Sequence, residues 1–193
     1  MHEPQSDERS TRALLRSVPQ RGRLQAILVR EDRRGPVRSL DDASAVAGLG
    51  LVADHRTHGR EPDPQARRQV TLIQAEHLPV IAGLVARDEV APQLLRRNLV
   101  VAGINLASLR DRRFSVGEVE LEGSGWCHPC SRMEEALGPG GYQAVRGHGG
   151  ITARVLTSGR LYRDDVVVTL DDTAGADGHP DPADEPSAEH PSL

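Results

Sequence analysis

The chain has 193 residues, of which 37% are hydrophobic and only 2% aromatic, so it suits one domain with tails and a core of aliphatic side chains. The formal net charge is -4, which provides no global basic field, and we therefore expect no nucleic-acid partner. The 24 basic residues other than histidine are all arginine, and the absence of lysine excludes both covalently held pyridoxal phosphate and the lysine of a P-loop.

The sequence carries no sign of export or membrane insertion. It contains no apolar run of about 18 residues, so we expect no transmembrane helix and no membrane partner. Its N-terminal segment lacks the apolar stretch of a signal peptide. Two closely spaced cysteines without an export signal are typical of a reducing compartment, and we expect a cytoplasmic protein.

Composition divides the chain into three parts. Residues 1–20 are polar and are predicted to form an N-terminal arm, either frayed or as a short helix. Residues 21–170 are the predicted folded domain. Residues 171–193 form an acidic tail rich in Pro and Ala, which cannot bury enough apolar surface to offset its chain entropy and is predicted to be disordered.

Short strands separated by glycine-rich turns dominate the predicted domain. The predicted strands, in chain order, span residues 23–30, 69–74, 97–101, 113–116, 119–121, 151–156 and 166–170. One clear helix is predicted over residues 75–87, where Leu78, Ile81 and Val85 recur at helical spacing and Pro79 fits only in the first turn. This pattern predicts a mostly β fold with a few helices, either β-barrel-like or α+β.

Both cysteines of the chain lie in one short segment, GSGWCHPCSRM, at residues 123–133. Cys127 and Cys130 are three positions apart and too few to form a disulfide scaffold. A helix is predicted to start at Ser131, directly after Cys130. A thiol at that place lies near the positive end of the helix dipole, which favours the thiolate.

The spacing of the cysteines leaves four interpretations open. One thiolate ligates a metal or carries sulfur, the two thiols form a redox pair, they are half of a zinc site, or they only pack. A redox pair lacks the βαβ pattern that precedes the motif in thioredoxin-like proteins. A zinc site needs four ligands, so His55, His58 or His148 would have to complete it.

Several polar segments that precede strands are candidate anion sites. Arg97 and Asn98 follow Arg96 directly before a predicted strand and could clamp a phosphate, or form a solvated start of that strand. Arg68 stands before another strand with the same two interpretations.

Two loops add further candidates. The loop at 147–150, with His148 and Gly149, would let main-chain N–H groups approach a ligand, or is an ordinary tight connection. Asp54 and His55 form the charged tip of another loop, where a histidine is more often a surface residue than a ligand.

Taken in order, these pieces resemble the MOSC domain, the module at the C-terminus of molybdenum cofactor sulfurases. The resemblance covers about residues 22–170. The segments that carry it are GLGLVAD at 48–54, RQVTLI at 68–73, RNLVVAGI at 97–104, FSVG at 114–117, LEG at 121–123, PC at 129–130 and GHGG at 147–150.

The resemblance implies a β-barrel-like MOSC fold and a bound molybdenum cofactor, a molybdopterin. It points to Cys130, the cysteine that follows proline, as the catalytic residue and molybdenum ligand, or as the carrier of a persulfide. The residues that it implies as cofactor contacts are Arg97, Asn98, Arg68, Asp54, His148 and Gly149. Cys127 would resolve a persulfide, add a ligand or only pack.

The function implied by the resemblance is that of a stand-alone MOSC protein, a small molybdenum oxidoreductase that reduces N-hydroxylated compounds. Its electrons would come from an external flavin or iron–sulfur reductase. The alternative is a persulfide carrier or cofactor-handling protein without its own turnover, with molybdenum cofactor biosynthesis proteins as partners. The chain is not itself a cysteine desulfurase, because it lacks lysine and the aminotransferase-like half of the sulfurases.

Overall fold

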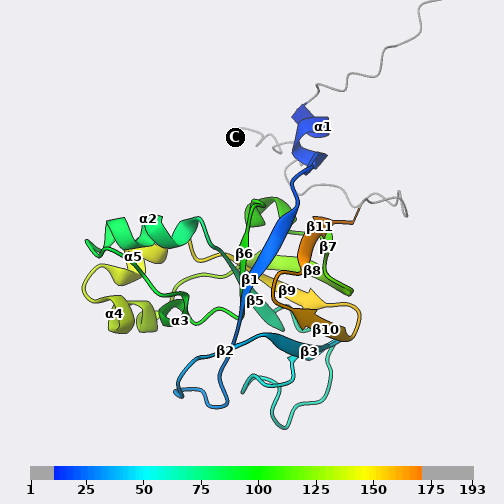
Figure 1. Cartoon of the computed structure of the whole chain (residues 1–193), viewed down its shortest axis with the longest axis horizontal. Helices are drawn as coiled ribbons and strands as arrows, with labels where there is room; N and C mark the ends of the chain where they lie inside the picture. The colour runs from blue at the N-terminus through cyan, green and yellow to red at the C-terminus, as the bar shows by residue number, and fades with distance from the viewer. Residues whose placement is uncertain (1–10, 171–193) are drawn as a thin grey trace, which may run out of the picture.

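The computed structural model describes residues 11–170, and its centre is a closed, mixed barrel of seven strands (Figure 1). The strand order is β11-β7-β8-β9-β5-β6-β1, and the barrel closes because β1 pairs with both β6 and β11. The barrel strands are β1 (Gly22–Val29), β5 (Val70–Gln74), β6 (Leu99–Ala102), β7 (Arg113–Val116), β8 (Val119–Trp126), β9 (Ile151–Val155) and β11 (Val166–Thr169).

A second, smaller sheet lies beside the barrel. It has the order β10-β3-β4, from β10 (Gly159–Tyr162), β3 (Asp42–Val46) and β4 (Gly50–Leu51). Strand β2 (Arg38–Leu40) pairs with the end of β1 outside the barrel closure. The turn after β4 leads back towards the barrel and carries the Asp54 loop.

Helices α2 to α5 gather on one side of the barrel, whereas α1 lies apart from them (Figure 1). Among the barrel strands only β5 and β6 are parallel neighbours, and their connection carries α2 (His77–Leu84) and α3 (Pro92–Leu95). Helices α4 (Ser131–Leu137) and α5 (Gly141–Val145) follow β8. The chain also forms α1 (Thr11–Arg16) before β1 and a short 3-10 helix, η1 (Leu106–Leu109), after β6.

Two aliphatic clusters hold these layers together. Leu72 and Leu99 point into the barrel and belong to its interior cluster. Their neighbours Ile73 and Val100 point to the opposite face, as successive strand residues do, and belong to a second cluster with buried residues of α2, α4 and α5. Strands β5 and β6 are therefore buried on both faces, which matches their continuous apolar sequences.

The predicted mostly β, barrel-like architecture is confirmed, and every barrel strand coincides with a predicted strand. Strand β8 continues to Trp126, beyond the predicted end at 121, because Gly123 and Gly125 bend it through an irregular register instead of ending it. The helix start predicted at Ser131 is the first residue of α4. The prediction missed the small sheet and helices α3 and α5, since these elements are too short to show periodicity.

Both ends of the chain were predicted to be less ordered. Within the predicted arm the structure describes only the residues from Thr11 onward, which begin with α1. Residues 1–10 and the predicted tail at 171–193 lie outside the described residues. Over residues 11–170, no helix has the length and apolar character needed to cross a membrane.

Candidate functional site

A strongly cationic cavity of about 370 Å³ lies beside Cys130. Its walls come from the segments that follow β1 and β4, precede β5 and β6, and lead into α4. The arginines that line it are Arg30, Arg33, Arg56, Arg68, Arg96, Arg97 and Arg132. These residues are far apart in sequence, so the fold concentrates their charge. We call this space the arginine cavity.

The arginine cavity holds positive charge that carboxylates of the protein neutralise only in part. Burial lowers the pKa of Arg30, Arg56 and Arg96, and repulsion from a neighbouring arginine lowers each of them further. Guanidinium groups nevertheless stay charged in proteins because their pKa values start so high. Asp54 is the carboxylate that partly offsets all three. The arrangement favours an anionic ligand.

Arg97 is buried, with 3% of its surface exposed, and three of its nitrogens donate to main-chain carbonyls. Nε donates to Gly149 at 2.8 Å, Nη1 to Leu95 at 2.7 Å and Nη2 to Cys127 at 3.0 Å. Burial lowers its pKa, while Cys127 opposes that shift. The side chain therefore connects the segment at 123–133, which we call the cysteine segment, to the loop at 147–150, which we call the glycine-rich loop. Its predicted contact with a cofactor stays a prediction, and the geometry gives it a positioning role.

The glycine-rich loop needs its glycines to pack against the cysteine segment. A Cβ on Gly149 would lie 2.3 Å from the carbonyl oxygen of Cys127. Gly150 has a φ of +80°, and a Cβ there would lie 1.9 Å from the carbonyl oxygen of Leu72. His148 packs edge-on against His77 of α2 with ring centroids 5.1 Å apart, and it is not among the residues that line the arginine cavity.

Asn98 and Asp54 form a buried polar network under the arginine cavity. Asn98 Oδ1 accepts from the main-chain N–H of Thr71 at 3.2 Å and from its hydroxyl at 2.9 Å. Asn98 Nδ2 donates to Asp54 Oδ2 at 3.1 Å, and Asp54 Oδ1 accepts from the N–H of Arg56 at 3.1 Å. The network thus fixes the loop after β4 against the starts of β5 and β6.

His55 joins this network, although the sequence suggested a surface histidine. Its Nδ1 lies 2.9 Å from Asp54 Oδ1, and its side chain lines the arginine cavity. Burial lowers the pKa of His55, and the Asp54 carboxylate works against that shift. The sequence signal was the adjacency of an aspartate and a histidine, but only the fold shows that His55 lines the cavity with Asp54 buried beside it.

The two cysteines have different surroundings. Cys130 is exposed, lines the arginine cavity and occupies the N-cap position of α4. Cys127 is buried, and its Sγ accepts a 3.5 Å hydrogen bond from Arg68 Nη2. Across residues 11–170 no group of three or more His, Cys, Asp or Glu side chains is placed to hold a metal ion. The described residues therefore do not form the four-ligand zinc site considered from the sequence.

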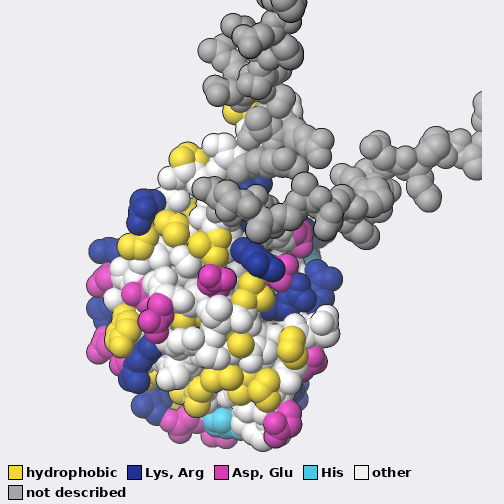
Figure 2. All heavy atoms as spheres, turned by 90° about the vertical axis from the view of Figure 1, so that its right-hand side faces the viewer, with side chains coloured by type: hydrophobic (Ala, Val, Ile, Leu, Met, Phe, Trp, Pro, Cys, Tyr) yellow, Lys and Arg dark blue, Asp and Glu magenta, His cyan; other side chains and the backbone are white. Residues whose placement is uncertain are grey.

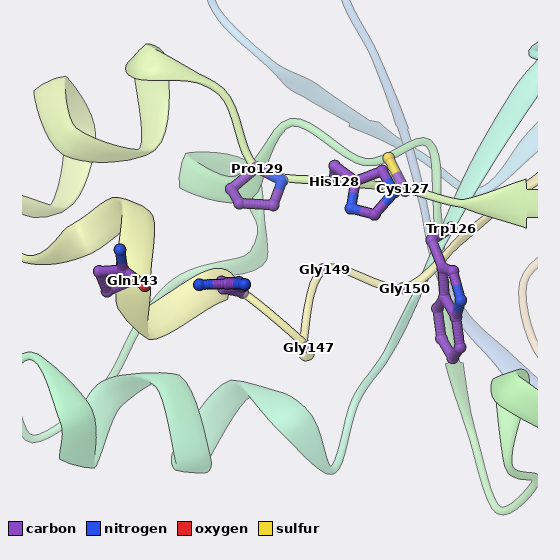
Figure 3. A pocket seen from close by; sticks show the side chains of 9 residues that line it. Trp126, Cys127, His128, Pro129, Gln143, Gly147, Gly149 and Gly150 are labelled. Carbon is purple, nitrogen blue, oxygen red and sulfur yellow. The ribbon is translucent and has the colours of Figure 1, made fainter. Parts of the chain in front are cut away.

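A second cavity of about 580 Å³ lies on the other side of the cysteine segment (Figure 3). Its walls come from α5, the glycine-rich loop and the end of β8, and it shares Trp126, His128 and Pro129 with the arginine cavity. Trp126 is 43% exposed, and the Arg110 guanidinium stacks on its ring at 4.7 Å from the centroid. The segment from Trp126 to Pro129 thus divides two neighbouring cavities.

Barrel and cavity together define a class: a small β-barrel protein with a cationic pocket beside one exposed thiol. A family model of the MOSC domain matches residues 54–168. Because this match spans more than half of the chain, the protein belongs to the MOSC domain family, as its sequence motifs predicted.

Solved structures of similar proteins have the same fold. The YuaD protein from Bacillus subtilis is 19% identical, with a TM-score of 0.65 over 76% of this chain and 94% of that one. YiiM from Escherichia coli is 17% identical, with a TM-score of 0.59 over 79% and 72% of the two chains. YiiM from Geobacillus stearothermophilus is 15% identical, with a TM-score of 0.62 over 80% and 78%. No curated protein sequence matches the chain.

Proposed function

We propose that this stand-alone MOSC protein binds molybdenum cofactor through the Cys130 thiolate and reduces N-hydroxylated compounds. The observation that carries the proposal is the position of an exposed thiol on the wall of a cavity lined by arginines. Electrons come from an external flavin or iron–sulfur reductase. The free cysteines fit a cytoplasmic location, which we also propose.

The donor groups of the cavity fit the chemistry of this cofactor. Molybdenum cofactor combines a soft metal–sulfur centre with a phosphate group. The cavity combines one soft sulfur donor, Cys130, with guanidinium groups that bind phosphate oxygens in pairs. When bound, the cofactor supplies the two-electron chemistry that removes oxygen from nitrogen.

Other residues at the cavity would bind the cofactor or hold the binding residues in position. Arg56 and Arg68 are placed to hold the anionic end of the cofactor, since both line the cavity. Asp54 and Asn98 hold the loop that carries Arg56. Arg97 keeps the cysteine segment against the glycine-rich loop, which fixes the place of Cys130.

Metal analysis tests this proposal most directly. Protein made in a host that synthesises molybdenum cofactor should contain molybdenum, and the Cys130→Ser variant should lose most of it because a hydroxyl is a poor ligand for a soft centre. Cys127→Ser is the matched control and should keep its metal, since that thiol is buried and bonded to Arg68. Wild-type protein without molybdenum would refute the proposal.

A persulfide carrier without turnover is the second candidate, and partners in cofactor biosynthesis belong to it. The exposure of Cys130 favours it, because sulfur transfer between proteins needs an accessible thiol. It predicts a mass increase of about 32 Da on Cys130, one sulfur atom, that dithiothreitol removes. A carrier would show this adduct in protein that contains no molybdenum.

A further inference from the structure

Removal of oxygen from an N-hydroxylated compound needs protons as well as electrons. The N–O bond breaks, the substrate takes up two electrons and two protons, and the oxygen leaves as water. The external reductase supplies the electrons. The arginines of the cavity cannot supply the protons, because a guanidinium does not give up its proton near neutral pH. The other titratable side chains that line the cavity are His55, His128 and Cys130, and Cys130 is the proposed metal ligand.

His55 has the position that this role requires. It lines the same cavity as Cys130, and its Nδ1 is buried beside the Asp54 carboxylate at 2.9 Å. Within residues 11–170, Nε2 makes no hydrogen bond to the protein, so it is the nitrogen available to a molecule in the cavity. An imidazole with a carboxylate close to Nδ1 and with Nε2 open is a common arrangement for proton transfer.

The support under His55 is rigid. Asp54 is 2% exposed and is held by Asn98 and by the N–H of Arg56. The main-chain N–H of His55 donates to the carbonyl of Arg30 at 2.6 Å, which fixes the backbone that carries the imidazole ring. Together these contacts orient the His55 side chain at the wall of the cavity.

We propose that His55 is the proton donor of the reaction and that Asp54 positions it. His55 takes a proton from solvent in the cavity and delivers it from Nε2 to the hydroxyl oxygen, which leaves as water, while the second proton comes from solvent and goes to the nitrogen. The proposal rests on the proposed reductase function. The charged groups that act on His55 are Asp54, Arg30 and Arg56, and burial together with the two arginines makes its imidazolium a stronger acid than a free one.

The pH dependence of the reaction follows from this role. The protonated form of His55 is the active one, so turnover should fall as pH rises through the pKa of His55. That pKa lies below the ordinary value of about 6.5, because burial lowers it. The His55→Gln variant should lose this dependence on pH and lower kcat by about 100-fold, the usual effect of removing a general acid.

The experiment uses full-length protein loaded with cofactor, reduced methyl viologen as electron donor and benzamidoxime as substrate. It compares wild type, His55→Gln and the control His58→Gln, an exposed histidine of the same loop. Molybdenum content should be equal in all three, and His58→Gln should keep the kcat of wild type. Normal molybdenum content with unchanged kcat in His55→Gln would overturn this inference alone. Wild-type protein without molybdenum would overturn the proposed function, and this inference with it.

A second measurement needs no cofactor. NMR titration of the His55 ring in cofactor-free protein should show a lower pKa in Asp54→Asn than in wild type, because the variant removes the attractive charge at 2.9 Å. Thermal unfolding checks that the isosteric variant is folded. An identical titration in folded Asp54→Asn would contradict the coupling of the two residues.

Discussion

At the scale of single residues, Arg97 shows how the donors of a charged side chain can be bound by main-chain carbonyls of the protein itself. From the sequence, Arg97 is a candidate phosphate ligand because it directly precedes a predicted strand. In the fold, three of its donors instead satisfy carbonyls of α3, the cysteine segment and the glycine-rich loop. Six other arginines line the same cavity.

Replacing Arg97 with methionine should therefore reduce stability first. The Arg97→Met variant leaves three main-chain carbonyls without their partner, and we expect the free energy of unfolding to fall by about 3 kcal/mol or more. Urea denaturation measures the change. Arg33→Met removes an exposed arginine of the same cavity and should cost less than about 0.5 kcal/mol. Equal effects of the two substitutions would contradict the positioning role.

The same scale shows what a sequence can reveal about a site. Cys130 stood out because cysteine is rare here and follows proline beside a predicted helix. Arg30, Arg33 and Arg132 did not stand out, since arginine occurs throughout this lysine-free chain and nothing local marks the ones that converge. His55 was noticed but assigned to the surface, because its burial depends on segments distant in sequence.

At the scale of elements, the glycine-rich loop and the cysteine segment act as one unit. The loop leads into β9, the segment leaves β8, and these two strands pair from Trp126 and Ile151 onward. Their contact continues past the strands through Cys127 N–H, which donates to the carbonyl of Gly150 at 2.9 Å. The wall between the two cavities is thus an extension of a β-ladder.

A methyl group at Gly149 tests this unit. The Gly149→Ala variant places a Cβ against the Cys127 carbonyl, and we expect it to lower stability by about 1–3 kcal/mol and to weaken metal retention. Gly83→Ala is the control, because its Cβ would meet open space on α2. We expect it to raise the free energy of unfolding by about 0.5–1 kcal/mol, since alanine is favoured over glycine inside a helix. Thermal unfolding and metal analysis report on both. A stable, metal-retaining Gly149→Ala would show that the two segments move apart freely.

The barrel strands could be predicted from the sequence, whereas the small sheet could not. The seven barrel strands were recognisable because each is a short apolar run between turn residues. The small sheet was missed because β4 has two residues and β3 carries alanines without strong strand preference. Since the Asp54 loop follows that sheet, the prediction had no means of placing it at the cavity.

At the scale of the whole molecule, charge is distributed unevenly. The chain has a net charge of -4, yet its arginines converge on one cavity. On the face of the barrel turned to the viewer in Figure 2, side chains of both signs are interspersed with hydrophobic ones. An anion therefore meets a local attractive field in a protein whose net charge has the same sign as the anion.

This field should make anion binding depend on salt. We expect inorganic pyrophosphate to bind the cavity, with an affinity that falls by about tenfold between low and high ionic strength as screening increases. Trp126, the single tryptophan of the chain, borders the cavity and reports binding through its fluorescence. Arg56→Gln should weaken binding, whereas Arg163→Gln, an exposed arginine paired with Asp41, should not. Salt-independent binding would argue against an electrostatic site.

Barrel closure carries a consequence for how the protein is made. Strand β1 completes its pairing only with β11, through Gly22 opposite Val167 and Arg23 opposite Val166. During synthesis the edge of β1 that receives β11 stays open until that last strand has left the ribosome. A nascent chain with an open strand edge is prone to pair with other chains, and such distant pairing makes folding slow. Yield in cells should then depend on chaperones that cover this edge while translation finishes.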